Sequence, residues 1–276
     1  MIKQMSAVLL ALCFVCATAL AGGVGNAVTP IKTTTEHIGV AVGFENDFIV
    51  DRLNPLENKY GPRSMEITDF SRNYGKITVG LSDSSNLYMH IGTGDYDLKF
   101  VDRAQDASME VNLEPGLYTG VGINGLMPVN EEIEVPYGNL SFGVGADTQI
   151  NTFFNEVDSL VRSTFRADNV RGGFYGVEGQ SSVYVTMQYE VEPLETLIIP
   201  YIGMYHSWMF VGTYDELRYT SETTGDVGED FQAAHDFASF GLIFGADFDV
   251  AKYLNVSIEG RFIGENAVTT GVSLKF

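Results

Sequence analysis

Apolar and polar residues alternate with a period of two along most of this sequence, and this pattern constrains the fold more than any other feature. In the stretch "GNLSFGVGADTQI", Leu140, Phe142 and Val144 share one face, while the opposite face carries glycines, Asp147 and Gln149. Successive side chains of a β-strand point to opposite sides, so a period of two indicates strands with two different environments. Comparable stretches recur along the chain and predict an all-β protein of about ten antiparallel strands, with eight or twelve as alternatives.

The two faces of these strands have an unusual composition. The polar faces are rich in glycine, which suits a crowded interior, while the apolar faces are broad and carry no charged residue. A charge facing lipid near the middle of a bilayer costs about 2–4 kcal/mol. Hydrocarbon also offers no partner for an open strand edge, so such a sheet must close. The faces therefore predict an up-and-down transmembrane β-barrel with apolar side chains outward and polar side chains inward.

The predicted links between strands alternate in length. Long links are expected at about residues 45–73, 98–116, 151–180 and 212–235, and the links between them at "SDSSN", "MPVNEEIEVP", "EPLE" and "DVAKY"; the short final hairpin "GEN" is an exception to the alternation. Transmembrane barrels show this alternation because one rim carries short turns and the other carries loops. With an even number of strands, both ends of the barrel chain fall on the short-turn side.

The beginning of the chain has the features of a secretory signal peptide. Lys3 is followed by the uncharged run "AVLLALCFVCATA", and Ala19 and Ala21 fit the small-residue cleavage pattern. The run is too short for a membrane helix, which needs about 20 apolar residues. The predicted organisation is a cleaved signal peptide over 1–21, an N-terminal periplasmic lead-in over 22–36 and an outer-membrane barrel over 37–276.

Composition excludes several other classes of protein. The formal net charge is −20, from 36 acidic and 16 basic residues, so a nucleic acid would be repelled rather than bound. Cys13 and Cys16, the two cysteines, both fall in the predicted signal peptide. The mature chain then has no thiolate ligand for a metal, and we expect neither a metal nor a cofactor.

Two stretches of the sequence resemble a known group of proteins. The stretches "RNYGKITVGLSDSSNLYMHIGTGDYDL" and "FGLIFGADFDVAKYLNVSIEGRFIGENAVTTGVSLKF" are similar to small bacterial outer-membrane β-barrels of the porin-like, opacity-protein-like superfamily. The resemblance covers most of the mature chain by pattern. It implies assembly by periplasmic chaperones and the barrel-assembly machinery, with Val272, Leu274 and Phe276 as the assembly signal. It also implies contact with outer-membrane lipid and lipopolysaccharide, and we expect a monomer.

Charged residues on the predicted inward faces form a candidate lumen network. Glu259 and Arg261 lie two residues apart on one strand, so their side chains point the same way. The remaining predicted members are Lys76, Asp147, Glu190 and Lys275. Such a network either fills and rigidifies the interior or selects ions at a constriction. Because a ten-stranded barrel is only modestly wider than the filled eight-stranded kind, any conductance should be small.

Two pairs of residues at predicted strand ends raise the question of catalysis. Asp95 and Asp97 lie where a strand meets a long link, and His235 and Asp236 lie where another link meets a strand. The chain resembles omptin proteases in this respect, which are ten-stranded barrels with paired aspartates and an Asp-His pair on the outer rim. The spacing of His235 and Asp236 departs from the omptin pattern.

A third pair resembles a different enzyme family. His206 and Ser207 are adjacent, whereas the histidine and serine of lipid A deacylases are separated by one residue. We therefore predict no enzyme activity and keep a rim hydrolase, omptin-like or deacylase-like, as the alternative.

Two other stretches leave alternatives open. Acidic residues in predicted loops form either a solvated surface or weak Ca²⁺ ligands; they are Asp215, Glu216, Asp226, Glu229 and Asp230. The stretch "TFFNEVDSLVRSTF" over 152–166 is either a short helix or a continuation of the preceding strand. Helical spacing relates Phe153, Val157, Leu160, Val161 and Phe165, with Thr152 as an N-cap.

The sequence as a whole predicts an integral outer-membrane barrel with a structural or surface role and weak porin-like permeation of small solutes. The alternatives are the rim hydrolase and a surface adhesin that uses the acidic loops.

Overall fold

The protein is almost entirely β-structure in the computed structural model, which describes residues 39–51, 63–102, 107–129, 131–162, 165–221, 225–229, 237–250 and 253–276. Within these ranges the strands are β1 (Val40–Asp51), β2 (Arg63–Ser82), β3 (Ser85–Asp102), β4 (Ala107–Leu113), β5 (Gly116–Pro128), β6 (Ile133–Val135), β7 (Gly138–Arg162), β8 (Phe165–Arg166), β9 (Asp168–Val191), β10 (Thr196–Ser221), β11 (Gly225–Glu229), β12 (Phe237–Val250), β13 (Leu254–Phe262) and β14 (Asn266–Lys275). A short 3₁₀ helix, η1 (Glu192–Leu194), joins β9 to β10. No helix among the described residues is long and apolar enough to cross a membrane.

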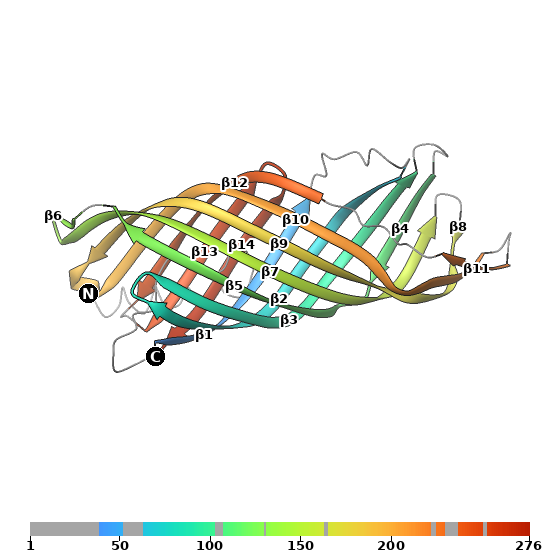
Figure 1. Cartoon of the computed structure of the whole chain (residues 1–276), viewed down its shortest axis with the longest axis horizontal. Coiled ribbons are helices and arrows are strands. Elements are labelled where there is room, and N and C mark those ends of the chain that lie inside the picture. The colour runs from blue at the N-terminus through green and yellow to red at the C-terminus, as the bar shows by residue number, and fades with distance from the viewer. Residues whose placement is uncertain are drawn as a thin grey trace.

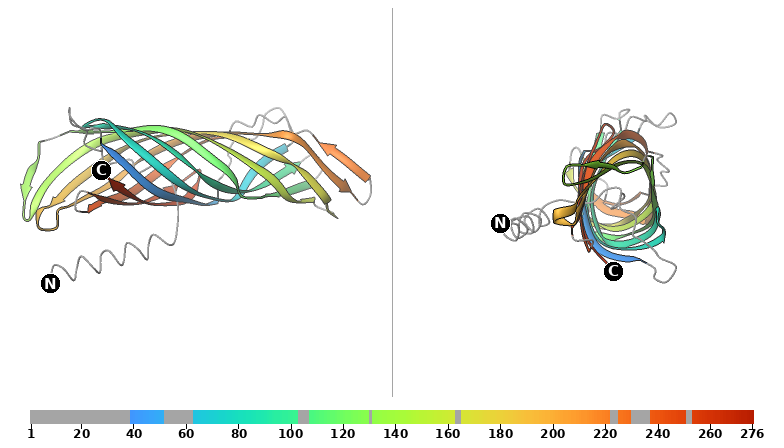
Figure 2. Two further views of the ribbon diagram at one scale, coloured as in Figure 1. Left: turned by 90° about the horizontal axis from the view of Figure 1, so that it is seen from below. Right: turned by 90° about the vertical axis from the view of Figure 1, so that its left-hand side faces the viewer.

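The strands close into a ring with ten positions (Figure 2, right). The order around the ring is β1, β2, β3, β4 with β5, β7, β9, β10, β12, β13 and β14, and β14 pairs with β1. β4 and β5 share one position because both pair with β3 on one side and β7 on the other. Glu114 and Pro115 separate them. All these pairings are antiparallel, so the predicted ten-stranded antiparallel barrel is confirmed.

The register of the strands fixes their tilt. The offset is found by stepping from each residue to its register partner on the next strand until the path has gone once around the ring. Starting from Val250 of β12, the partners are Leu254, Leu274, Val42, Ile77, Met89, Val121, Ile150, Gly179, Trp208 and finally Ala238, again on β12. The path therefore returns twelve residues away from its start, at 238 instead of 250. With ordinary strand spacing, this offset over ten strands gives a tilt of about 40° to the barrel axis.

The first and last strands of the barrel meet at one end, here called the near end. The backbone N–H of Phe276 donates to the carbonyl of Val40 over 2.8 Å, and that of Val40 donates back over 3.3 Å. The C-terminus and β6 lie at this end, while β8 and β11 lie at the opposite end, here called the far end (Figure 1).

The middle of the barrel has apolar side chains outside and polar side chains inside. On β7, Phe142, Val144 and Ile150 are exposed on the outer face, whereas Asp147 and Gln149 are buried in the interior. The same arrangement holds on β1, β3, β9 and β13. The predicted outward orientation of the apolar faces is therefore confirmed for this apolar band.

The arrangement is reversed towards the far end. On β7, Phe153 and Val157 point inward and are buried, while Glu156 and Asp158 are exposed on the outside. The strands thus continue beyond the apolar band as a cylinder with the polarity of a water-soluble barrel. Its core is a cluster of buried side chains, the far-end core, that includes Ile49, Phe70, Tyr96, Leu98, Phe100, Met109, Val111, Phe153, Leu160, Phe174, Met209, Val211 and Leu217.

This extension corrects the predicted long links. β1 runs to Asp51, β2 begins at Arg63, and β10 continues to Ser221, so much of the sequence assigned to loops is strand. The alternation persists in these segments but its sense changes, since polar residues now face outward.

The helix over 152–166 is also wrong, and the alternative of a continued strand is correct. β7 runs unbroken from Gly138 to Arg162. Its apolar residues at helical spacing include both inward residues such as Leu160 and outward ones such as Val161, because successive residues of a strand point to opposite faces. The predicted signal peptide and lead-in, over 1–36, lie outside the described residues.

Candidate functional site

The interior of the apolar band is occupied by a layer of ion pairs. The guanidinium of Arg72 contacts Glu178 over 2.8 Å and Asp47 over 3.3 Å. It also donates a hydrogen bond of 2.6 Å to the hydroxyl of Tyr118 and lies 4.1 Å from the centre of the Phe70 ring. β2 supplies Arg72, and its acidic partners come from β1 and β9, so this side chain spans the lumen.

A second arginine lies in the same layer. Arg261 contacts Asp47 over 2.8 Å and Glu259 over 3.4 Å, and it also pairs with Glu265. Asp47 therefore bridges Arg261 to Arg72. A buried charge left unpaired costs several kcal/mol, so each carboxylate here stabilises the arginine that it faces.

A third group of polar side chains lies closer to the near end. The ammonium of Lys76 is 3.0 Å from Glu45 and 4.2 Å from the centre of the Tyr88 ring. The hydroxyl of Tyr88 donates to Asp147 over 2.9 Å. The interior is therefore cross-linked from β1 through β2 and β3 to β7.

The structure brings together only part of the predicted lumen network. Lys76, Asp147, Glu259 and Arg261 are buried in the interior. Lys275 also faces the interior, at the near end, where it pairs with the buried Asp249 over 2.6 Å. Glu190 is exposed at the end of β9 and does not reach the layer of ion pairs.

Sequence reasoning missed several members of the layer: Glu45, Asp47, Arg72, Glu178 and Glu265. Glu45 and Asp47 continue the period of two set by Ala41 and Gly43. They fell in a segment assigned to a loop, and following the alternation further would have placed them inside.

Acids outnumber bases inside the described part of the barrel. The buried acidic residues are Glu45, Asp47, Asp147, Glu178, Asp247, Asp249, Glu259 and Glu265, and the buried basic residues are Arg72, Lys76 and Arg261. The interior therefore favours cations electrostatically. Among the described residues, no cluster of histidine, cysteine or carboxylate side chains could hold a metal ion.

The far-end core closes the interior above the ion pairs. The rings of Tyr96 and Phe153 stack with centroids 4.1 Å apart, and Phe70 contacts Tyr96 at the same distance. Phe174 contacts Phe100 at 6.1 Å. These rings come from four strands and meet in the interior, so the far end is packed with apolar side chains.

The predicted catalytic candidates do not converge in the described residues. Asp95 is exposed on the outer face of β3, and Asp97 lies on the same face. His206 faces outward with its ring tilted against that of Phe240, the ring centroids 4.4 Å apart, whereas Ser207 points inward and is buried. His235 and Asp236 lie outside the described residues.

The remaining predicted residues lie at the two ends of the barrel. Val272, Leu274 and Phe276 share the outer face at the near end, where Phe276 is 78% exposed. At the far end, Asp215 is exposed and belongs to β10 together with Glu216, while Asp226 and Glu229 belong to β11. These four are therefore strand residues and not loop residues; Asp230 lies outside the described residues.

A closed antiparallel ring, an apolar outer band and a polar interior define a transmembrane β-barrel of the bacterial outer-membrane type. No family model and no curated protein matches the sequence. Solved structures with a similar fold include outer-membrane barrels. The outer membrane protease OmpT from Escherichia coli is 13% identical, with a TM-score of 0.39, over 87% of this chain and 96% of that one.

Two further solved structures extend this list. The translocator domain of the autotransporter NalP from Neisseria meningitidis is 11% identical, with a TM-score of 0.39, over 89% of this chain and 90% of that one. An outer membrane channel from Pseudomonas putida F1 is 9% identical, with a TM-score of 0.36, over 93% of this chain and 100% of that one. A protease, a translocator and a channel have different activities, and this likeness concerns the fold alone.

Proposed function

We propose that the protein is a sealed barrel of the bacterial outer membrane, exported by its signal peptide, with a structural and surface-exposed role. The observation that carries this proposal is the filled interior. Arg72, Arg261 and their carboxylate partners occupy the lumen within the apolar band, and the far-end core lies above them. A solute crossing the barrel would have to displace both layers.

The surface role rests on the extension at the far end. Its outer face carries Asp95, Glu156, Asp158 and Asp215, while its core is apolar. An extension built in this way is stable in water and presents a rigid, acidic surface beyond the membrane. Such a surface suits contact with cations, lipopolysaccharide sugars or other cell-surface molecules.

Recording from the refolded protein in a planar bilayer tests the sealed barrel. We expect no current steps from the wild-type protein, because ion pairs and the far-end core occupy the interior that the structure describes. The triple variant Arg72→Ala, Tyr96→Ala, Phe153→Ala opens both the layer of ion pairs and the far-end core and should produce small or flickering steps. Stable, large steps from the wild-type protein would overturn the proposal.

A second candidate function is a weak leak for small cations. The excess of buried acids over bases favours it, since an acidic lumen attracts cations and repels anions. The same recordings decide between the two, because a leak gives small steps whose reversal potential in a salt gradient shifts towards that of the cation.

A further inference from the structure

The outer surface of the barrel has one wall that differs from the rest. β7, β9 and β10 lie side by side, and their outward residues are uncharged over unusually long runs. On β9 this run extends from Tyr175 to Val191, and on β10 it extends from Ile198 to Tyr214. On β3, by contrast, the corresponding run from Leu87 ends at Asp95.

This tall wall is higher than the apolar band of an outer-membrane barrel. Seventeen residues, 175 to 191, at about 3.3 Å each and a tilt of about 40° span about 40 Å along the barrel axis. The apolar band of such barrels is about 25 Å tall. Tilting the whole barrel would shift the band on opposite walls but would not lengthen it on one wall.

The upper part of the tall wall is an aromatic patch. Tyr175 lies 5.9 Å from Phe210, and Phe154 lies 6.4 Å from Tyr214, measured between ring centroids. The indole of Trp208 lies over Gly179, where a Cβ atom would come within 2.2 Å of it. Aromatic residues are enriched in the cores of protein–protein interfaces.

The middle of the same wall carries a row of polar side chains within the apolar band. Thr148, Ser181 and His206 are paired neighbours on β7, β9 and β10, and Thr148 donates a hydrogen bond of 3.2 Å to Ser181. Hydroxyl and imidazole groups can both donate and accept hydrogen bonds. In the membrane, such residues commonly bond across a protein interface.

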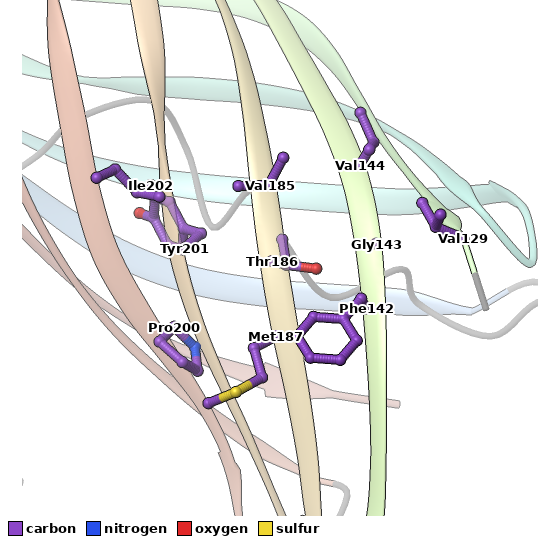
Figure 3. Close-up of a pocket in the computed structure, with 10 residues that line it drawn as sticks. All are labelled: Val129, Phe142, Gly143, Val144, Val185, Thr186, Met187, Pro200, Tyr201 and Ile202. Atoms are coloured by element: carbon purple, nitrogen blue, oxygen red, sulfur yellow. The ribbon is translucent and has the colours of Figure 1, made fainter. Parts of the chain in front are cut away.

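The lower part of the tall wall has a groove of about 550 Å³. Figure 3 shows two rows of apolar side chains across it, Phe142 with Met187 and Pro200, and Val144 with Val185 and Ile202. Pro200 has no N–H, and the pairing of β9 with β10 omits it together with Ile199. The surface of the wall therefore has ridges and a groove, which is the shape that interdigitating side chains of a protein partner require.

We propose that the tall wall is the interface of a homodimer, in which two copies stand side by side in the membrane about a two-fold axis along its normal. A two-fold axis along the membrane normal keeps every residue at the same depth in both copies, so the polar row, the aromatic patch and the groove of one copy each face the same feature of the other. The polar row is self-complementary, and the aromatic patch is covered by the second aromatic patch. The sequence alone favours a monomer, and this proposal replaces that expectation.

Charge favours this wall as the place where a second copy packs. The protein has a formal net charge of −20, so two copies repel each other wherever their acidic surfaces meet. The tall wall is the face whose outward residues stay uncharged furthest towards the far end. It lets two copies approach over the full height of the membrane and above it.

Cysteine cross-linking in membranes tests the interface. Cys13 and Cys16 are the only cysteines in the sequence and both fall in the predicted signal peptide, so the exported chain provides a cysteine-free background. In it, Ser181→Cys and Val183→Cys place a thiol at the centre of the tall wall, and a disulfide forms only if the two Cα atoms come within about 7 Å. We expect disulfide-linked dimers of both variants after mild oxidation.

The matched control is Thr93→Cys, an exposed outward residue on β3 on another wall, which should remain monomeric. Equal cross-linking of the control, or none at residues 181 and 183, would overturn the proposal. The second measurement is the mass of the wild-type protein in lipid nanodiscs. We expect a dimer that dissociates more readily in the Trp208→Ala, Phe210→Ala variant, and a monomeric wild type would contradict the interface and leave the sealed barrel unaffected.

Discussion

At the scale of single residues, the interior depends on a few arginines that each serve several carboxylates. Asp47 contacts both Arg72 and Arg261, so a change at one position alters the electrostatics of the whole layer. Because these groups are buried, water cannot replace a lost partner. The layer therefore acts as one unit, and its members should be strongly non-additive in mutational tests.

Arg261→Met tests this unit. The variant leaves Asp47, Glu259 and Glu265 without a shared partner in the interior, and we expect the free energy of unfolding to fall by about 3–5 kcal/mol. Urea unfolding in detergent micelles measures it, with the fluorescence of Trp208, the single tryptophan, as the probe.

The matched control for this variant is Lys99→Met. Lys99 is partly exposed and pairs with Glu110 over 3.7 Å on the outside of the extension. Exposed pairs of this kind contribute about 0–1 kcal/mol, so the control should differ little from the wild type. Equal losses in the two variants would show that the buried layer has no special role.

At the scale of the element, the outer face of a single strand lies partly in lipid and partly in water. β7 has Ile150 and Phe154 outward where it faces lipid, and Glu156 and Asp158 outward where it faces water. Its inward face changes in the opposite sense, from Asp147 to Phe153. The boundary between the uncharged and the acidic part of the outer surface on this strand therefore lies between Phe154 and Glu156.

Arginine substitution along β7 locates this boundary. Ile150→Arg places a charge in the apolar band and should lower the free energy of unfolding by about 2–4 kcal/mol. Asp158→Arg lies beyond the boundary and should change it by less than about 0.5 kcal/mol. Unfolding in lipid vesicles gives both values, and a comparable loss at residue 158 would mean that the membrane extends over the extension.

The sequence predicted the barrel but not its height. Alternation at period two identifies strands and their faces, so the ten positions and the outward apolar side chains could be read from residues such as Phe142 and Val144. The position where apolar residues change from the outward to the inward face cannot be identified in the same way, because the period of two continues through it. Arg72 and Glu178 were missed for this reason, and their contacts also depend on which strands meet across the lumen.

At the scale of the whole molecule, the barrel is closed by the pairing of its first and last strands. β1 and β14 pair from Ala41 and Lys275 at the near end to Asp51 and Asn266. The backbone of Phe276 adds two hydrogen bonds with Val40 beyond that ladder. Its side chain points outward and is free to be recognised during assembly.

Deletion of Phe276 tests both contributions. We expect less folded protein in the membrane fraction, measured as the heat-modifiable band on a gel, because closure loses two hydrogen bonds and the aromatic side chain. Tyr253→Ala is the control, since Tyr253 is also an exposed aromatic residue at the near end. A wild-type yield of folded protein after the deletion would show that assembly does not depend on Phe276.

The twelve-residue offset around the ring has a consequence for how this chain can change. Alternate residues face opposite sides, so a circuit of the barrel can close only if the offset is an even number. Inserting one residue within a strand makes the offset odd. Every side chain of that strand on one side of the insertion then changes face, so lipid-facing residues point into the lumen and lumen-facing residues point into lipid. Length changes inside the wall must therefore come in pairs or be absorbed by a bulge, whereas the links between strands obey no such parity.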